Sequence, residues 1–420
     1  MRQSHKAKLR DIFNAAVKAA RPADCVARNL PSMPIGRTIV VGAGKASAAM
    51  AQAFEANWEG PLAGLVVTRY GHAVPCRTIE VVQASHPVPD AKGHETATRM
   101  LKLVSGLTKD DLVVALMSGG GSSLLSLPPD GVTHTEKRAL NLELLSSGAP
   151  IAAMNCLRKH VSRIKGGRLA VAAYPARVVT LAISDIPGDD LAAVASGPTL
   201  ADSSTFADAR AVVEKYGLVL PNSITRHLEE AADETPKPDN PRLAGALSIC
   251  IASPRQSLEA AAQAARKHGY IPHVLGDAIE GEACDVALSM ATQVRDAAAR
   301  SQPIALLSGG ETTVTLRGTG VGGRNVEFLL ALAIELEDMP GVHALSADSD
   351  GIDGAAEVAG AFMTPDTLSR AHDLGLDPSH FLANNDAHTF FSHLGDQLVT
   401  GPTLTNVNDI RIILVDPVGR

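Results

Sequence analysis

The 420-residue sequence predicts an α/β protein of two domains, and three observations support this prediction. The length exceeds what one core usually serves, because domains commonly run to about 100–200 residues. Short apolar runs end repeatedly in glycine or serine with helical patterns between them, which is typical of buried strands in parallel sheets. The clearest runs are residues 38–41, 112–117, 178–183 and 304–307. A polar stretch with three prolines, residues 229–242, places a domain boundary near residue 235.

The first 20 residues predict a helix that packs against the protein. Apolar positions recur there at helical spacing, at Leu9, Ile12, Phe13, Ala16, Val17 and Ala20. A transit peptide is the less favoured interpretation, because Asp11 interrupts it and cleavage would remove core-forming residues. No apolar run approaches the roughly 18 residues that span a bilayer, so we expect a soluble, cytoplasmic protein.

Charge and cysteine content exclude several classes of function. The net charge is −7 and aromatic residues make up 3%, so the basic, aromatic-rich surface of a nucleic-acid binder is missing. The five cysteines include no C-x-x-C pair, which disfavours zinc and disulfide frameworks and favours a reducing compartment. We expect no nucleic-acid or membrane partner, a small-molecule ligand, and either a monomer or a homodimer. Because the net charge is negative, any anionic ligand must be held by individual groups at its site, such as backbone N–H groups or nearby cations.

A glycine turn follows the first predicted strand. Gly42 and Gly44 precede Lys45 at a strand–turn–helix junction, where backbone N–H groups point toward the end of the strand. The segment fails the Walker pattern and matches a dinucleotide fingerprint only in part, because Ser47 occupies the third glycine position. A lysine at the positive end of a helix is unfavourable unless an anion joins it. Lys45 therefore either extends into water or belongs to an anion site.

Two further segments combine glycine with hydroxyl side chains after a predicted strand. Glycines let a phosphate approach the backbone, and serines add donors. One such segment in each domain predicts a cleft that holds an anionic ligand. The segments are Ser118, Gly119, Gly120, Gly121 and Ser122 in the first half, and Ser308, Gly309, Gly310 and Glu311 in the second.

The segment 155–168 is locally basic. Arg158, Ser162 and Lys165 are spaced as one helical face, and the glycines at 166–167 would end that helix. Such a face is typical either of an anion site or of solvated cations at a helix C-terminus, and both interpretations stay open.

Residues 318–323 contain four glycines, which excludes a regular helix or strand there. They predict a flexible loop that delivers Arg324 to the start of a helix over 327–335. A guanidinium suits bidentate binding of a carboxylate or of a phosphoryl group in transfer. A structural salt bridge is the alternative.

Two groups of carboxylates are candidates for a metal site. Asp348, Asp350 and Asp353 resemble a calcium loop, but Ile352 occupies its fifth position. Magnesium held by one or two carboxylates and phosphate oxygens fits better, and Asx turns are the alternative. Asp189 lies in a second carboxylate-rich turn. The predicted metal ligands are Asp189, Asp350 and Asp353.

These motifs occur together with others in a fixed order along nearly the whole chain. The order is Gly42-Ala-Gly-Lys45, Ser118-Gly-Gly-Gly-Ser, Asn155 to Lys165-Gly-Gly, Ser184-Asp-Ile-Pro-Gly-Asp189, Ser196-Gly-Pro-Thr, Gly320 to Arg324-Asn325, Asp350-Gly to Asp353-Gly, and Thr400-Gly-Pro-Thr to Asp409. The ordered set resembles the glycerate 2-kinase family, whose C-terminal half is called the MOFRL domain.

The resemblance implies ATP- and Mg²⁺-dependent conversion of D-glycerate to 2-phosphoglycerate. It implies a Rossmann-like three-layer N-terminal domain, here 1–235, a smaller α/β/α domain, here 236–420, and an active site in the cleft between them. Lys45 and Arg324 match the catalytic pair proposed for the family. Phosphoryl transfer needs positioning and charge neutralisation, so Lys45 would neutralise the phosphoryl group and Arg324 would clamp a carboxylate or the transition-state oxygens. Asp189 is the candidate general base.

Two other functions compete with this interpretation. Some members of the family carry the label hydroxypyruvate reductase, and an NAD(P)-dependent reductase would explain the glycine turn. It would also need an acidic residue at the end of the second strand, whereas Glu59 precedes that strand. A non-catalytic phosphate sensor would explain the loops but not the carboxylates.

Overall fold

The chain forms two compact units in the computed structural model, which describes residues 4–354 and 357–417. The first unit comprises residues 22–251, and the second combines residues 1–21 with 252–420. The structure thus divides the chain differently from the boundary predicted near residue 235. The polar stretch 229–242 lies inside the first unit, because the strand that follows it, β6, completes the sheet of that unit.

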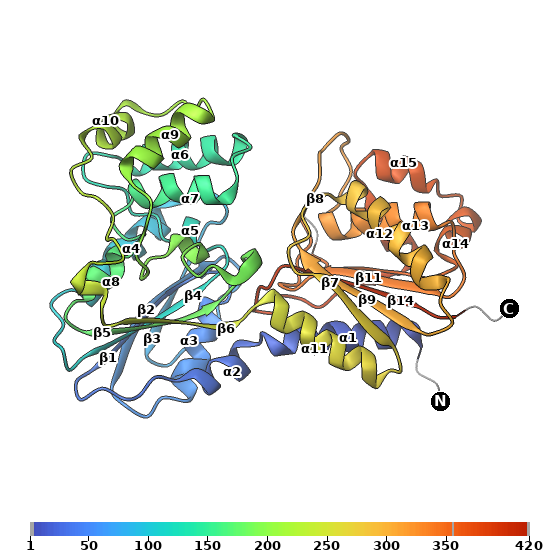
Figure 1. Ribbon diagram of the computed structural model, residues 1–420, viewed down its shortest axis with the longest axis horizontal. Coiled ribbons are helices and arrows are strands. Elements are labelled where there is room, and N and C mark those ends of the chain that lie inside the picture. Colours follow the sequence, from blue (N-terminus) through green and yellow to red (C-terminus); the bar gives the residue numbers. More distant parts are fainter. Residues whose placement is uncertain (1–3, 355–356, 418–420) are drawn as a thin grey trace. The chain divides into compact units, whose positions relative to one another are not determined.

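A six-stranded sheet in the order β3-β2-β1-β4-β5-β6 forms the centre of the first unit (Figure 1). The pairs β1–β2, β1–β4, β2–β3 and β4–β5 are parallel, as the sequence predicts. Every residue of β1 and β4 is buried, because helices cover both faces of the sheet. The strands are β1 (Thr38–Ala43), β2 (Leu62–Arg69), β3 (Ile79–Ala84), β4 (Leu112–Ser118), β5 (Arg177–Ile183) and β6 (Ala246–Ala252).

The helices of the first unit cover this sheet and extend beyond it. Asp90 caps α4 by accepting a hydrogen bond from the N–H of Gly93. The helices are α2 (Pro22–Cys25), α3 (Ser47–Ala56), α4 (Ala91–Val104), α5 (Gly121–Leu124), α6 (His134–Ser146), α7 (Ile151–His160), α8 (Arg168–Ala173), α9 (Phe206–Lys215) and α10 (Asn222–Glu230). Short 3₁₀ turns are η1 (Ala27–Asn29), η2 (Pro187–Asp189), η3 (Val194–Ser196) and η4 (Pro241–Leu243).

The strand order of the first unit reverses between β1 and β4. The chain proceeds from β1 toward β3 on one side and from β4 toward β6 on the other. In open α/β sheets, ligands bind beyond the carboxyl ends of the strands at such a switch point. The glycine-rich turns after β1 and β4 therefore meet where the fold favours a ligand.

The second unit also has a six-stranded sheet, in the order β13-β12-β11-β14-β9-β7, but this sheet is mixed. Of its described strand pairs, β7–β9 is parallel and the others are antiparallel. The prediction of parallel sheets is wrong here, because the last strand, β14, enters the centre of the sheet in the opposite direction. The strands are β7 (Ile271–Gly276), β9 (Ile304–Gly310), β11 (Val342–Asp348), β12 (Gly360–Met363), β13 (Gln397–Leu398) and β14 (Asp409–Val415), with β8 (Gly281–Glu282) and β10 (Thr312–Thr313) in a separate pair.

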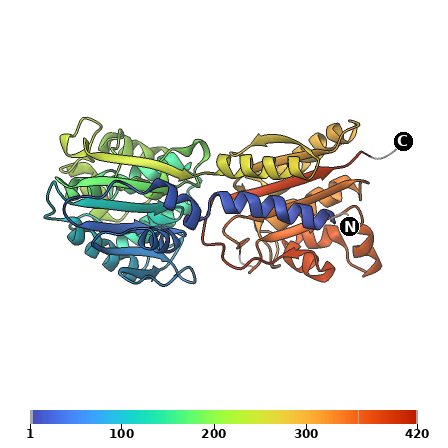
Figure 2. The same ribbon diagram turned by 90° about the horizontal axis from the view of Figure 1, so that it is seen from below.

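Helices cover both faces of the second sheet, which gives the predicted α/β/α layers (Figures 1 and 2). Side chains on successive strand residues point to opposite faces. Leu307 and Ile412 accordingly pack with α1 and α11, whereas Leu306 and Ile413 pack with α12 and α13. The helices are α1 (His5–Ala19), α11 (Pro254–Lys267), α12 (Ala283–Ala298), α13 (Arg324–Leu336), α14 (Thr367–Asp373), α15 (Pro378–Ala383) and α16 (Ala387–Leu394).

The N-terminal helix α1 is the packing helix that the sequence predicts. Leu9, Ile12, Phe13 and Ala16 are buried, and α1 lies beside α11 (Figure 2). Although it begins the chain, it therefore belongs to the core of the second unit. Across the described ranges, no helix is long and apolar enough to cross a bilayer.

Candidate active site

The turn after β1 uses its backbone donors within the protein. The N–H of Lys45 donates to the carbonyl of Gly119 at 2.8 Å, and the N–H of Ala46 donates to Ser118 Oγ at 3.0 Å. The N–H of Gly44 donates to a carbonyl of β2 at 3.2 Å. This turn therefore does not present the backbone cradle for a phosphate that its glycines predict.

The glycines of this turn serve its close packing against β4. Gly44 has a φ of 138°, and a Cβ there would lie 2.1 Å from Ser118 Oγ. A Cβ at Gly42 would lie 2.6 Å from the carbonyl oxygen of Leu116. Any larger residue at either position would force β1 and its turn away from β4.

The turn after β4 keeps its backbone donors available. Within the described ranges, no acceptor is found for the N–H groups of Gly120, Gly121 and Ser122. A Cβ at Gly120 would lie 3.4 Å from Lys45 Cγ and 2.9 Å from the ring of His86. The side chain of Lys45 thus lies against this turn, where a cation and open N–H groups together suit an anion.

A chain of hydrogen bonds links this turn to two residues that the site prediction left out. Ser122 Oγ lies 2.7 Å from Ser196 Oγ, which donates to Asn155 Oδ1 at 2.9 Å. Ala195 and Ser196 have φ values of 52° and 60°, a region that residues other than glycine rarely occupy. Such strain is concentrated at functional sites. The Ser196-Gly-Pro-Thr motif was the sequence signal for this network.

Lys165 contacts the same turn, and two further basic residues, Lys137 and Arg158, lie close to Lys165. Lys165 Nζ donates to the carbonyl of Ser122 at 2.6 Å, and Lys137 Nζ donates to that of Val161 at 2.7 Å. Burial lowers the pKa of Lys137 to about 7, and the positive charge of Arg158 adds to this effect. Burial and the two neighbouring cations also hold the pKa of Lys165 well below its usual value.

The predicted common helical face of Arg158, Ser162 and Lys165 is wrong. Helix α7 ends at His160, so Arg158 lies in its last turn and the other two lie in the loop beyond it. Tertiary packing nevertheless brings Arg158 and Lys165 into the same cluster, together with Lys137 from α6. The sequence offered no signal for Lys137.

Asp189 lies in the loop after β5 and carries an unsatisfied oxygen. Its φ is 57°, and its Oδ1 is buried without a hydrogen-bond partner among the described residues. A buried carboxylate oxygen without a partner is costly unless a ligand or cation joins it. Asp189 therefore remains a candidate metal ligand or base.

Arg324 begins α13 and already binds three carboxylates. Its Nε donates to Asp409 at 2.9 Å, its Nη1 to Glu311 at 2.6 Å and its Nη2 to Asp348 at 2.8 Å. Burial acts to lower the pKa of Arg324, but the carboxylates together raise it above its usual value. Arg324 thus forms the structural salt bridges that were the alternative interpretation of this residue. A guanidinium has five N–H donors, and with the side chain 24% exposed, two donors remain for a ligand.

The partners of Arg324 meet at one edge of the second sheet. Asp348 at the end of β11 pairs in register with Asp409 at the start of β14, which pairs with Gly310 at the end of β9. Asn325 adds a hydrogen bond from Nδ2 to Asp409 at 2.7 Å. The mixed sheet therefore positions this polar network.

Residues 318–323 do not form the flexible loop that their glycines predict. The N–H of Gly318 donates to Asn385 Oδ1 at 2.9 Å, and the N–H of Gly320 donates to the carbonyl of Asn384 at 3.0 Å. A Cβ at Gly318 would lie 2.3 Å from that carbonyl oxygen. The glycines allow two backbone segments to approach closely, and this contact holds the loop in place.

The second predicted phosphate loop is not formed. Ser308, Gly309 and Gly310 lie inside β9, and the next element is strand β10, so no helix N-terminus follows them. A Cβ at Gly310 would lie 2.3 Å from the backbone of Ile279. Glu311 pairs with Arg324 instead of facing a phosphate. The similarity to Ser118–Ser122 is one of composition alone.

The carboxylates predicted as metal ligands in the second unit have local partners. Asp353 accepts hydrogen bonds from the backbone N–H groups of Asn325 and Val326 at 3.1 and 2.9 Å, and thereby caps α13. Burial raises its pKa to about 6. Asp350 Oδ1 accepts from the N–H of Ile352 at 2.9 Å, which is an Asx turn. These hydrogen bonds give Asp353 a structural role, and its described surroundings show no feature of a metal site.

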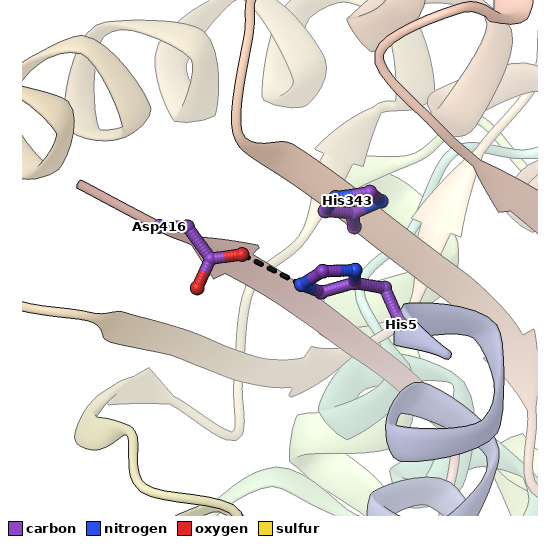
Figure 3. A group of neighbouring side chains, drawn as sticks. All are labelled: His5, His343 and Asp416. Carbon is purple, nitrogen blue, oxygen red and sulfur yellow. Dashed lines mark ion pairs between the residues drawn. The ribbon is translucent and has the colours of Figure 1, made fainter. Parts of the chain in front are cut away.

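A different group, His5, His343 and Asp416, satisfies the spacing of a metal site within the described residues (Figure 3). His5 Nε2 lies 2.7 Å from Asp416 Oδ2, and the two imidazole rings stack at 3.8 Å with an interplanar angle of 1°. A metal lies in the plane of each ring that binds it, which two parallel stacked rings do not permit for one ion. This group fastens α1 to the sheet.

His343 predicts a loss of stability in acid. Burial, with a smaller effect from His5, lowers its pKa to about 4. Because the unfolded value is about 6.5, its contribution to stability is present above about pH 6.5 and is lost between about pH 6.5 and 4. Thermal unfolding at pH 7 and 4.5 should show a smaller decrease in Tm for His343→Gln than for the original protein. Replacement of exposed His372 is the control, and equal decreases in all three proteins would contradict the assignment.

Comparisons with known proteins place this geometry in context. Residues 8–229 match a domain family described as a domain of unknown function, DUF4147, and residues 304–409 match the MOFRL family. A relative from Agrobacterium vitis with the provisional name hydroxypyruvate reductase is 53% identical over 97% of this chain and 94% of its own. D-glycerate 2-kinase from Thermotoga maritima is 39% identical over 96% of this chain and 97% of its own. The crystal structure of glycerate kinase from Thermotoga maritima has a TM-score of 0.88 and 39% identity, with 97% of this chain and 99% of that chain covered.

Proposed function

The chain belongs to the glycerate 2-kinase family with a MOFRL domain, and from this membership we propose that it transfers the γ-phosphoryl group of ATP to the 2-hydroxyl of D-glycerate. The observation that carries the proposal is the β4 turn. Its open N–H groups at Gly120–Ser122 lie at the switch point of a parallel sheet, with the side chain of Lys45 against them. Such a turn suits a phosphate group.

Lys45 has the role of neutralising charge on the transferring phosphoryl group. Its backbone is fixed by the hydrogen bond to Gly119 and by acceptance from Thr68 Oγ1 at 3.3 Å. A fixed backbone limits the region that the ammonium group can reach, which favours electrostatic stabilisation of a transition state formed beside this turn.

Arg324 has a supporting role through its two remaining donors. The three carboxylates hold the guanidinium in one orientation, so little freedom is lost when it binds a ligand. The carboxylates also offset the positive charge of the guanidinium. We therefore propose that Arg324 orients an oxygen anion of the ligand and contributes less to its electrostatic attraction.

The surroundings of Asp189 fit Mg²⁺, which accompanies ATP in kinases. Its orphaned Oδ1 offers the hard oxygen ligand that Mg²⁺ takes from one or two carboxylates besides phosphate oxygens. Bound Mg²⁺ supplies neutralisation of the phosphate charge. Alternatively, this oxygen accepts the proton of the substrate hydroxyl, and Asp350 is then the candidate Mg²⁺ ligand.

The rival activity is an NAD(P)-dependent hydroxypyruvate reductase, the name that the Agrobacterium vitis relative carries. A dinucleotide fold uses the N–H groups of the first turn for the pyrophosphate and an acid at the end of the second strand. Here those N–H groups bind Ser118 and Gly119, and β2 ends at Arg69. An arginine there would suit NADP, so the test includes both cofactors.

One comparison of activities tests the proposal. The purified protein is incubated with D-glycerate in three separate reactions, which contain ATP with Mg²⁺, NAD⁺, or NADP⁺. Phosphorylated products are identified by ³¹P NMR, and reduced cofactor is measured by its absorbance. We expect 2-phosphoglycerate with ATP, and its loss after exhaustive chelation. Reduction of NAD⁺ or NADP⁺ without phosphoryl transfer would refute the kinase, and full turnover after chelation would refute the metal requirement.

A further inference from the structure

The first unit contains a cluster of three basic side chains without an acidic counterpart among the described residues. Besides burial, the charge of Arg158 lowers the pKa of both Lys137 and Lys165, so the three side chains are close, and within the described part of the chain none of them forms an ion pair. The acceptors of Lys137 and Lys165 are backbone carbonyls. Basic groups buried in proteins are normally paired with an acidic partner, so this arrangement favours an anionic ligand.

Arg158 is the member of this cluster that is available to a ligand. Both lysine ammonium groups are buried against carbonyls, whereas the guanidinium of Arg158 is half-buried and has no hydrogen-bond partner among the described residues. If Arg158 were an ordinary solvated cation near a helix end, it would extend into water. Burial instead lowers its pKa from the usual value.

The cluster is joined to the proposed phosphate turn by short contacts. Lys165 binds the carbonyl of Ser122, and Ser122 connects through Ser196 to Asn155. Asn155 lies three residues before Arg158, and residues so spaced are neighbours on one face of a helix. An anion on Arg158 would therefore lie near a phosphate bound at Gly120–Ser122.

We propose that Arg158 binds the carboxylate of the hydroxy-acid substrate. The assignment rests on the proposed function, because the acceptor then carries one carboxylate besides the hydroxyl that is phosphorylated. The guanidinium matches a carboxylate through two parallel N–H bonds, which a lysine does not offer. Arg158 thus determines specificity for acids over neutral alcohols.

Arg158→Gln tests the proposal through two independent measurements. The KM for D-glycerate should rise about 10- to 100-fold, while the KM for ATP stays within about twofold. The Tm without ligand should stay equal or rise, because the substitution removes an unpaired half-buried charge. A structural arginine would behave oppositely, with a lower Tm and unchanged KM. Arg163→Gln is the matched control, since Arg163 is exposed and paired with Asp130.

A binding experiment separates failure of this assignment from failure of the proposed function. Calorimetry without ATP measures the binding affinity of D-glycerate, and separately that of inorganic phosphate, for the original protein and for Arg158→Gln. Glycerate binding that depends on Arg158 supports the site even if the original protein transfers no phosphoryl group. Phosphate binding that depends on Arg158, with glycerate binding unchanged, would assign the residue to ATP and overturn the proposal. Equal glycerate binding by both proteins would overturn it as well.

Discussion

Lys45→Ala should lower kcat by more than about tenfold while the protein keeps its thermal stability. A tenfold loss corresponds to about 1.4 kcal/mol of transition-state stabilisation, which is modest for a cation on a transferring phosphoryl group. Stability should persist because the turn is held by the backbone of Lys45, which donates to Gly119 and accepts from Thr68, and alanine retains both contacts. Steady-state kinetics and thermal unfolding measure the two effects.

The control for this substitution is Lys92→Ala, which removes an exposed lysine of the same unit that pairs with Glu95. It should leave kcat unchanged. A near-normal kcat for Lys45→Ala would show that Lys45 is a surface lysine and would remove the main support for phosphate binding at the β4 turn.

Arg324→Ala should be the most damaging substitution, because it affects stability as well as activity. It leaves Asp348 and Asp409 buried beside each other without their common partner, and removal of one member of a buried ion pair typically costs about 3–5 kcal/mol. Arg411 remains 3.1 Å from Asp409 and limits the damage. We expect a clearly lower Tm and, in the folded fraction, a lower kcat/KM.

Arg324→Lys separates the two effects, since lysine keeps the charge but cannot reach three carboxylates with one nitrogen. We expect an intermediate Tm and a kcat/KM well below that of the original protein. Arg295→Lys, at an exposed arginine paired with Glu335, should change neither quantity. If the lysine variant is destabilised but fully active once folded, Arg324 is structural and has no part in the reaction.

The sequence determined most of the architecture because the relevant signals are local. Runs such as 112–117 are apolar throughout, which is typical of a strand covered on both faces, and β4 occupies that place. Helix α1 follows from a 3.6-residue spacing of apolar side chains, and the turn at Gly120 follows from the left-handed conformation that glycine adopts without strain. The family resemblance then rested on the order of such turns.

Tertiary structure alone decided which of these turns presents donors to a ligand. The turns after β1 and β4 look equally suitable in sequence, yet Ala46 and Ser118, which are 72 positions apart, form a hydrogen bond that closes the first and not the second. The glycines at 318–323 look flexible until Asn384 and Asn385 bind their backbone. Similarly, Arg324 and Asp409 lie 85 positions apart, and Lys137 joins Arg158 from another helix. Hydrogen bonding and burial depend on partners that the fold brings together, so spacing along the chain does not reveal them.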